Sequence, residues 1–354
     1  MNSNNKMKQP LSLQSLVRPN IWNLAPYSSA RSEFHGDASV FLDANENPWN
    51  EPYNRYPDPL QRNLKARLAE LKNISEDQIF IGNGSDEAID LVIRAFAEPG
   101  IDHITTVTPT YGMYQVAADV NNVVCRQVEL GPGFTLNATR VLDAADDWTK
   151  VIILCSPNNP TGNTLDRREI YRILDQFPGI VVLDEAYIDF SEEPSFVAEL
   201  ARYPRLIVLQ TLSKAWGGAG LRLGMAFAAP EIIEILNKIK YPYNVSAPVQ
   251  EAALRLLADP ARMETQKRRI LTERSRLKQA LESAPFFFRV HPSDTNFLLV
   301  DVGRADQLYA SLVKRGVVVR NRNNITLCRG CLRITIGTEE ENNRLLKALE
   351  NQPA

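Results

Sequence analysis

The chain has 354 residues, 44% of them hydrophobic and 23% charged, and its formal net charge is −2 at pH 7. This composition and length predict a globular protein whose large core is shared between two domains. The near-neutral charge without a basic run argues against a nucleic-acid partner, and no apolar stretch approaches the roughly 18 residues of a membrane span.

The predicted elements begin after a polar N-terminal stretch. Residues 1–9 lack the apolar centre of a secretory signal, so we expect a cytoplasmic location. Residues 42–56 are rich in Asn and Pro and lack a period, which is typical of a loop. Leucines then recur at helical spacing between residues 60 and 71, which predicts an amphipathic helix.

Residues 79–229 alternate short apolar strands with helices. The expected strands are continuous aliphatic runs, which suit a sheet that is covered on both faces. With helices such as Arg167–Phe177 between the strands, the pattern predicts a doubly wound α/β fold. The expected strands are Ile79–Ile81, Ile104–Val107, Val123–Val124, Val151–Cys155, Ile180–Leu183 and Leu206–Leu209.

The pattern changes after Ala229. A long charged helical region is expected over residues 248–282, with strands near residues 296–301, 317–320 and 332–336. Thr338 and Glu341 form a capping box, which predicts a helix start. This part of the chain is therefore expected to form a smaller α+β domain.

The most informative polar segment is TLSKAWGGAGLRLG, residues 211–224. Ser213 and Lys214 follow an expected strand, at the sheet edge where open α/β sheets bind ligands. The glycines after Lys214 allow the backbone to approach a ligand closely. Taken alone, the segment could equally be a solvated lysine before a flexible loop.

Two further segments follow strand ends. Asp184 comes directly after a buried strand, where a carboxylate needs a cationic partner. A protonated pyridine nitrogen would serve, and Tyr187 could reach an oxygen on the same ring. In SPNNPTG, residues 156–162, two prolines stiffen the turn, so the Asn159 amide is a second candidate for that oxygen.

A phosphate cradle is predicted at GNGSDE, residues 82–87. Glycines between a strand and a helix N-terminus leave backbone N–H groups free for an anion. Glu87 stands where a dinucleotide fingerprint has its third glycine, which disfavours that interpretation. Arg222 could add a guanidinium fork. Together the segments predict a site for a phosphorylated, pyridine-containing aldehyde.

The order of these motifs resembles that of the fold-type-I aminotransferases, which use pyridoxal 5'-phosphate (PLP). The series GNGSDE, PTYGMY, SPNNPTG, DEAY, SKAWGGAGLR and GCLRI carries the likeness, which covers residues 18–346. The pieces APYSSAR, LDANENP, NRYP and GCLRITIGT are similar to the histidinol-phosphate aminotransferase subfamily. The resemblance implies a large domain, residues 42–247, with a mostly parallel seven-stranded sheet. It also implies a small α+β domain from residues 248–354, joined by residues 1–41.

The resemblance also implies a role for each candidate residue. Lys214 would be the Schiff-base lysine and proton shuttle, and Asp184 would pair with the pyridinium. Tyr187 and Asn159 would hold the phenolate oxygen, and Tyr111 would stack on the ring. The cofactor phosphate would be bound by Ser85, Asp86, Ser213 and Arg222, and by Tyr56 of the neighbouring subunit in a homodimer with shared active sites.

The implied reaction belongs to histidine biosynthesis. It would transfer the amino group of L-histidinol phosphate to 2-oxoglutarate, giving imidazole-acetol phosphate and glutamate. In the strand LRITI, Arg333 projects from the face opposite Leu332 and Ile334, although half of such arginines form surface ion pairs. By resemblance Arg333 would bind a carboxylate or phosphate and Arg320 the far anion, with Tyr27 assisting.

Other interpretations stay open. The same motifs suit an aromatic or phospho-amino-acid aminotransferase, a threonine-phosphate decarboxylase, or a PLP-fold binding protein without turnover. Cys328 and Cys331 form a C-x-x-C, but the three histidines are scattered, so we expect a turn entering a strand and no metal.

Overall fold

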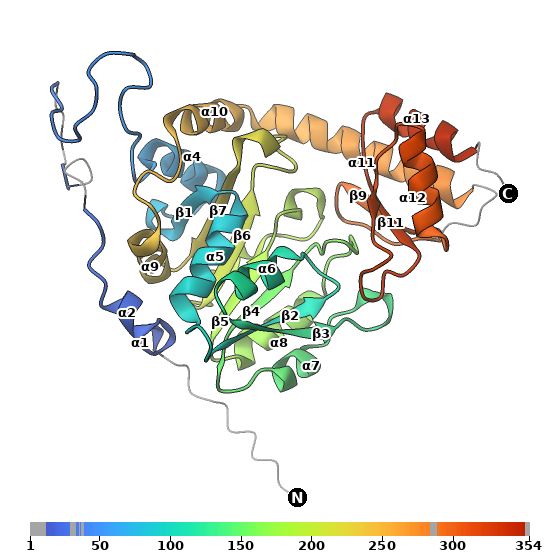
Figure 1. Ribbon diagram of the computed structural model, residues 1–354, viewed down its shortest axis with the longest axis horizontal. Helices are drawn as coiled ribbons and strands as arrows, with labels where there is room; N and C mark the ends of the chain where they lie inside the picture. The colour runs from blue at the N-terminus through green and yellow to red at the C-terminus, as the bar shows by residue number, and fades with distance from the viewer. Residues whose placement is uncertain (1–11, 29–32, 35, 37–38, 284–288, 351–354) are drawn as a thin grey trace, which may run out of the picture.

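The computed structural model describes residues 12–28, 33–34, 36, 39–283 and 289–350, and it contains a large and a small β-sheet (Figure 1). The larger sheet has seven strands: β1 (Ile79–Asn83), β2 (His103–Thr108), β3 (Val124–Glu129), β4 (Thr149–Cys155), β5 (Ile180–Asp184), β6 (Leu206–Thr211) and β7 (Leu223–Ala228). Their order is β1-β7-β6-β5-β4-β2-β3; β7 is antiparallel to both β1 and β6, and the other neighbouring strands pair in parallel. The mostly parallel seven-stranded sheet is confirmed.

Two details of the sheet differ from expectation. β7 is not among the expected strands, because the glycine-rich segment before it obscures the strand pattern. β3 begins at Val124 and continues through polar residues to Glu129, because it lies at the sheet edge, where one strand side lacks a neighbour.

The strands inside the sheet are buried on both faces, as their continuous aliphatic runs predict, whereas the edge strand β3 is partly exposed. In β5, Val181 and Leu183 join one core, while Ile180 and Val182 join the other. The first core is covered by α4 (Arg62–Lys72), α7 (Ala138–Ala144), α8 (Arg167–Gln176) and α10 (Ala247–Leu257). The second is covered by α5 (Ser85–Phe96), α6 (Met113–Val120) and α9 (Pro230–Ile239). Short 3-10 helices are η1 (Glu76–Gln78), η2 (Pro132–Phe134), η3 (Ile188–Phe190), η4 (Phe196–Glu199) and η5 (Ala219–Leu221).

The N-terminal helices α1 (Leu13–Leu16) and α2 (Pro19–Trp22) lie against the large sheet's helices. Leu16 and Val17 are buried in the same core as α5 and α9. The Arg18 amide donates to the Ala95 carbonyl at 2.9 Å, and Arg18 Nε lies 3.0 Å from Glu98 Oε2. These contacts hold residues 13–22 against the helices of the large sheet. The division into residues 1–41 and 248–354 as the small domain and 42–247 as the large domain stays a prediction.

The small sheet has the antiparallel order β10-β11-β9-β8, from β8 (Arg289–Val290), β9 (Phe297–Asp301), β10 (Arg320–Asn321) and β11 (Cys331–Thr335). It packs with α11 (Pro260–Glu282), α12 (Ala305–Lys314) and α13 (Glu339–Glu350) around its own core. The expected strand at residues 317–320 is shorter and begins at Arg320. The capping box is confirmed, since Glu341 Oε2 accepts the Thr338 amide at 2.7 Å.

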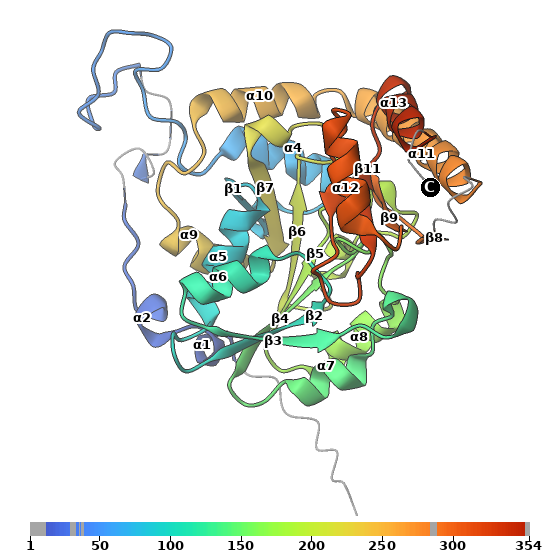
Figure 2. The ribbon, with the colours of Figure 1, turned by 45° about the vertical axis from the view of Figure 1, so that its right-hand side comes forward.

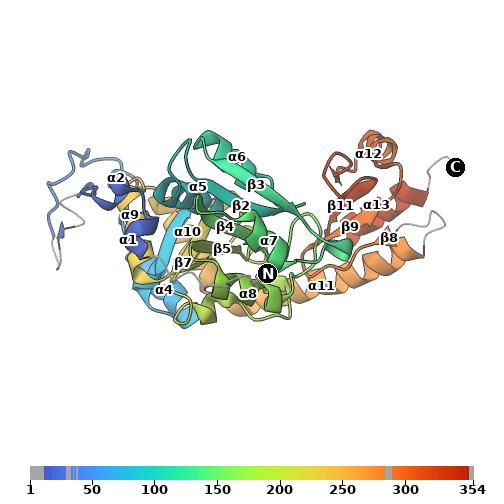
Figure 3. The ribbon, with the colours of Figure 1, turned by 90° about the horizontal axis from the view of Figure 1, so that it is seen from below.

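A set of hydrogen bonds beside the NPTG turn connects the two sheets. Asp294, in the loop between β8 and β9, accepts hydrogen bonds from the Thr164 amide at 3.0 Å and its hydroxyl at 2.8 Å. The Asp294 amide donates to the Gly162 carbonyl at 2.7 Å. Helix α11 runs from the large sheet's side to the small sheet (Figure 3). In the part of the chain that the structure describes, no helix is both long enough and apolar enough to cross a membrane.

Candidate active site

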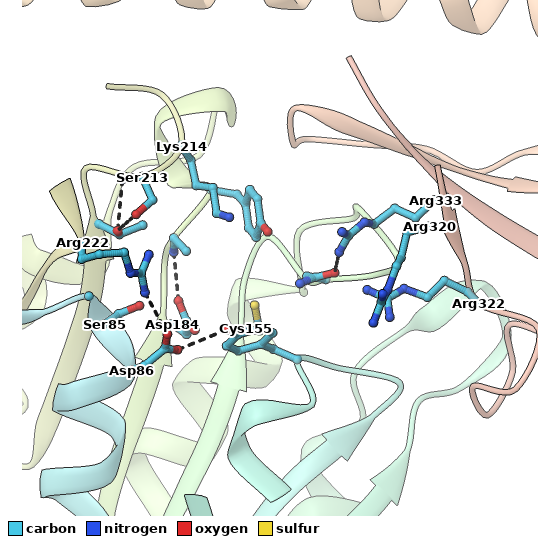
Figure 4. A pocket seen from close by; sticks show the side chains of 16 residues that line it. Ser85, Asp86, Cys155, Asp184, Ser213, Lys214, Arg222, Arg320, Arg322 and Arg333 are labelled. Carbon is cyan, nitrogen blue, oxygen red and sulfur yellow. Dashed lines mark hydrogen bonds and ion pairs between the residues drawn. The ribbon is translucent and has the colours of Figure 1, made fainter. Parts of the chain in front are cut away.

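A cavity of about 410 Å³ lies where β4, β5 and β6 end, and arginines of the small sheet line its other wall. Figure 2 shows the small sheet, with β9 and β11, beside the large sheet. Every predicted site residue lines it except Tyr27 and Tyr56. Those that line it are Ser85, Asp86, Tyr111, Asn159, Asp184, Tyr187, Ser213, Lys214, Arg222, Arg320 and Arg333. Figure 4 shows the large-sheet groups on one side and the arginines of the small sheet on the other.

The first turn of α5 forms one end of the cavity. Gly84 has φ +74°, and a Cβ there would lie 2.8 Å from Arg222 Nη2. A Cβ on Gly224 would lie 2.0 Å from the Ser85 amide nitrogen, so β7 and α5 approach each other as closely as glycine permits. Arg222 Nη2 lies 3.2 Å from Asp86 Oδ2. The free N–H groups of α5 and this guanidinium together favour an anion.

Asp184 ends β5 with its carboxylate almost fully buried, at 2% exposure. Its Oδ2 accepts a hydrogen bond from the Tyr114 hydroxyl at 2.7 Å, and its Oδ1 accepts one from the Ala186 amide at 3.0 Å. Burial raises the pKa of Asp184 above its ordinary value, because the charged form loses its hydration. The residue makes no ion pair within the described ranges, so a cationic group placed in the cavity would stabilise the carboxylate.

Lys214 lies just beyond β6, with its Nζ 5.4 Å from the centre of the Tyr187 ring. Burial, followed by the positive charge of Arg333, lowers the pKa of this amine below its ordinary value. The turn that carries Lys214 is fixed by Thr211, whose Oγ1 accepts the Ser213 amide at 3.1 Å. Lys214 is therefore a positioned amine that loses its proton more readily than a solvated lysine.

Asn159 joins the two walls of the cavity. It is buried in the NPTG turn, and its Oδ1 accepts a hydrogen bond from Arg333 Nη1 at 2.5 Å. Next to it, the fully buried Asn158 donates to the Pro109 carbonyl at 2.9 Å, which fixes the turn. Tyr187 packs edge-on against Phe297 of the small sheet, and burial raises the pKa of its hydroxyl.

Arg320 and Arg333 face the cavity from the small sheet. They are directly paired in the antiparallel register of β10 and β11, so their side chains share one face. Arg322 lies two residues after Arg320, on that same face, and also lines the cavity. Burial, followed by the charges of Arg333 and Arg320, lowers the pKa of Arg322 to about 10.

Tyr27 and Tyr56 lie outside this cavity. Tyr27 is 73% exposed. Tyr56 is 50% exposed and stacks on Tyr243, with ring centres 4.4 Å apart, beside a separate hollow. In APYSSAR, residues 29–31 lie outside the described residues. A single chain therefore does not bring these two tyrosines to the predicted site.

Some residues of the site were not predicted from the sequence. Tyr114 holds Asp184, Thr211 holds Ser213, Cys155 lines the cavity at the end of β4, and Arg322 adds a third guanidinium. Arg322 could have been found, because it follows Arg320, the last residue of an expected strand, by two residues and shares its face if the pairing continues. Tyr114 and Thr211 act through tertiary contacts or buried positions that no local pattern marks.

The C-x-x-C cysteines lie apart from this chemistry. Cys328 and Cys331 are buried thiols, and the Cys331 amide donates to the Cys328 carbonyl at 2.9 Å in a turn that enters β11. Among the described residues, no cluster of His, Cys, Asp or Glu side chains could hold a metal ion. The expected turn before a strand is confirmed.

Comparison with known proteins gives concordant results. The sequence matches the family described as aminotransferase class I and II over residues 37–349. The histidinol-phosphate aminotransferase of Parabacteroides distasonis is 68% identical over 339 residues, covering 96% of this chain and 98% of that protein. The crystal structure of the histidinol-phosphate aminotransferase from Clostridium acetobutylicum is 27% identical with a TM-score of 0.77, covering 84% of this chain and 90% of that one.

A decarboxylase is also similar in structure. The L-threonine-O-3-phosphate decarboxylase from Porphyromonas gingivalis is 25% identical with a TM-score of 0.71, and the match covers 84% of this chain and 90% of that one. Its identity is far below the 68% of the Parabacteroides relative. The chain belongs to the class I and II aminotransferase family and, within it, to the histidinol-phosphate aminotransferases.

Proposed function

We propose that this chain transfers the amino group of L-histidinol phosphate to 2-oxoglutarate, giving imidazole-acetol phosphate and glutamate in histidine biosynthesis. The observation that carries the proposal is a cavity lined by Lys214 and Asp184 on one wall and by three arginines on the other. The 68% identity to a histidinol-phosphate aminotransferase supports the choice of substrate. A cytoplasmic location stays a prediction.

The proposal includes pyridoxal 5'-phosphate as the cofactor, and the residues of the cavity fit it. A buried carboxylate without a cationic partner among the described residues suits a protonated pyridine nitrogen. The glycine-lined start of α5 leaves room and N–H donors for a phosphate. When bound, the cofactor supplies an aldehyde that condenses with amines and a ring that withdraws electrons from the carbon bearing the amine.

The phosphate end would be held by backbone and side-chain donors of the large domain. Ser85 and Asp86 would bind through their amides at the N-terminus of α5, where the helix dipole favours an anion. Ser213 and Arg222 would add a hydroxyl and a guanidinium from the connection between β6 and β7. In this arrangement Arg222 exchanges part of its contact with Asp86 for the phosphate.

Asp184 would fix the opposite end of the ring by accepting the N–H of the pyridinium. Its pKa is raised by burial, yet the Tyr114 hydroxyl and the Ala186 amide both stabilise the charged form. Paired with a cation, the carboxylate would stay ionised and correctly aimed. Asn159 and Tyr187 would donate to the phenolic oxygen, and Tyr111 would cover one face of the ring.

Lys214 would carry out the proton transfers. Its lowered pKa leaves a larger fraction of the amine neutral near pH 7, and only the neutral amine can attack an aldehyde or take a proton. As the proton shuttle, Nζ would accept the proton of the substrate carbon that bears the amine. The same Nζ would then give that proton back.

The substrate anions would face the small sheet. Arg333 would bind a carboxylate or phosphate, with its fork aimed by Asn159. Arg320 would bind the far anion. We also propose that Tyr27 assists at this end, although its exposed position in one chain means that it must come from a partner or move.

The proposal extends to a homodimer with shared active sites. Tyr56 lies outside the cavity of its own chain, on a segment with exposed apolar side chains that include Leu42, Trp49 and Tyr53. Contact with a second copy would bury these side chains. It would also allow Tyr56 to reach the cofactor phosphate of the neighbouring subunit.

A half-reaction screen tests the substrate. The PLP-loaded protein is mixed separately with histidinol phosphate, phenylalanine, tyrosine, aspartate and threonine phosphate, and loss of the visible cofactor absorbance is followed. Histidinol phosphate should react fastest, with no release of CO2. Faster reaction of threonine phosphate with CO2 release would favour the decarboxylase, the alternative that the Porphyromonas structure supports.

The variant Lys214→Ala tests whether Lys214 is the lysine that binds the cofactor. We expect kcat to fall by about 10⁴-fold or more, since a positioned acid–base group and the nucleophilic amine are both lost. Borohydride reduction of the loaded wild-type protein should label the peptide that contains residue 214, and the variant should show no label there. A labelled lysine elsewhere in the wild-type protein would refute the assignment.

A further inference from the structure

Arg322 is a third guanidinium on the substrate side of the cavity. Its amide donates to the Cys331 carbonyl at 3.0 Å, which continues the pairing of β10 with β11 by one residue. Since Arg320 and Arg333 are paired in that register, Arg322 projects from their face of the sheet. Figure 4 shows the three side chains together, across the cavity from Asp86 and Asp184.

The local structure does not account for the charge of Arg322. Within the described residues, its Nε is buried without a hydrogen-bond partner, and none of the three arginines forms an ion pair with a carboxylate. Arg333 donates to the neutral amide of Asn159 and lies over the Phe297 ring. Unpaired charges in a partly buried site destabilise it, so the cluster needs a ligand that carries more than one negative charge.

The candidate ligand charges differ between phosphate and carboxylate. A phosphate monoester carries about −1.5 to −2 at pH 7, because its second pKa is about 6, and it has three acceptor oxygens. A carboxylate carries −1 and has two. Arg320 and Arg333 can neutralise a single dianion or two carboxylates between them. A third fork adds attraction mainly for a ligand group with a second charge and a third oxygen.

We propose that Arg322 is a specificity-determining residue that makes this subsite select a phosphate-monoester dianion over a carboxylate. The inference deepens the proposed function and rests on it for the identity of the substrate. Arg322 would contact the phosphate of the amino donor, whereas the keto acid would use Arg320 and Arg333. The cofactor phosphate is not involved, since it would lie on the other wall with Arg222.

Equilibrium binding to the PLP-loaded protein tests the proposal without turnover. The probes are propyl phosphate, a dianion without an amine, and methyl propyl phosphate, a singly charged diester. In Arg322→Gln we expect affinity for propyl phosphate to fall by about 10- to 100-fold, the usual range for a lost charged hydrogen bond, and affinity for the diester to fall by less than about 3-fold. Calorimetry at pH 8 measures both.

Matched variants separate charge from structure. Arg329→Gln removes an exposed arginine of the same β10–β11 connection that does not line the cavity, and it should bind both probes as wild type does. Arg322→Lys keeps the charge without the fork and should recover part of the affinity. Equal loss of the two probes in Arg322→Gln, or the same loss in Arg329→Gln, would overturn the proposal.

The pH profile supplies a second readout. Wild-type affinity for propyl phosphate should fall as the pH drops through about 6, where the probe loses its second charge, and Arg322→Gln should flatten that step. With substrates, KM for histidinol phosphate should rise about 10-fold or more, with kcat and the KM for glutamate nearly unchanged. If histidinol phosphate does not react but the probes behave as stated, the proposed function fails while the dianion site stands. If it reacts and the probes do not discriminate, the role of Arg322 fails alone.

Discussion

The two walls of the cavity differ in the charges of their side chains. The large-sheet wall holds Lys214 and Arg222 together with Asp86 and Asp184, so charges of both signs are interleaved. The described small-sheet residues that line the cavity are all arginines, and a neutral amide, Asn159, is the side-chain hydrogen-bond partner of one of them.

The large-sheet wall suits a ligand that stays bound, whereas the small-sheet wall suits ligands that bind and leave. On the large-sheet wall, donors and acceptors are already fixed by neighbours such as Tyr114 and Thr211, which suits one ligand held in one pose. On the small-sheet wall, the excess positive charge must be neutralised by molecules that bind and leave in turn. A wall that accepts a phosphate ester and then a dicarboxylate benefits from forks that are not committed to protein carboxylates.

After Lys214→Ala, the next largest effect is expected from Asp184→Asn, which removes the buried charge of the large-sheet wall. The neutral amide cannot hold a pyridine nitrogen in its protonated state, so kcat should fall by about 10²- to 10³-fold. Steady-state kinetics at saturating cofactor measures this. Glu185→Gln is the matched control, since Glu185 is also buried after β5 but accepts hydrogen bonds from Ser195, Phe196 and Gln210 away from the cavity. A similar loss of kcat in both variants would mean that the fold, and not the charge, is what matters.

A smaller effect is expected from Tyr114→Phe. This change removes the 2.7 Å hydrogen bond to Asp184 and leaves the rest of the ring in place, so kcat should fall by about 10-fold. As a positioning residue, Tyr114 should also change the pH profile of cofactor binding, because its hydroxyl stabilises the ionised carboxylate. Tyr203→Phe loses a comparable bond to Asp175 Oδ1, at 2.9 Å and away from the cavity, and should leave both quantities unchanged. An unaltered profile in Tyr114→Phe would contradict the role.

The smallest effect is expected for the pKa of Lys214, on the large-sheet wall, when Arg333 on the small-sheet wall is replaced. In the wild-type protein, burial and then the charge of Arg333 lower the pKa of Lys214. Arg333→Gln removes that charge, so the pKa of Lys214 should rise toward its ordinary value and the neutral amine should appear only at higher pH. Peptide mass spectrometry can follow how fast an amine-reactive reagent modifies Lys214 in the cofactor-free protein. The pH at which this modification becomes fast should be higher in Arg333→Gln. Arg329→Gln should cause no shift, and a shift to lower pH in Arg333→Gln would exclude the coupling.

The sequence was most informative where function and chain order coincide. Asp184 ends a strand, and Lys214 and Asn159 each lie shortly after one, so a strand pattern and a polar residue were enough to place them on one sheet edge. Tyr114 could not be placed in this way, because its contact with Asp184 joins residues 70 positions apart. The packing of Leu16 and Val17 on the large sheet was also missed, since an apolar pair can fit either core. Tyr27 and Tyr56 lie apart from the site in a single chain, and the predicted role of Tyr56 is one toward the neighbouring subunit.

The antiparallel direction of β7 places two residues of the site close together in the sequence. Because β6 arrives at the functional edge of the sheet and β7 departs from it, Lys214 and Arg222 lie on a single short connection. Their spacing is thus set by eleven residues of contiguous chain, Leu212–Arg222, and needs no long-range assembly to be correct. An insertion in that stretch would move the amine relative to the guanidinium, while the same insertion between β2 and β3 would leave both in place.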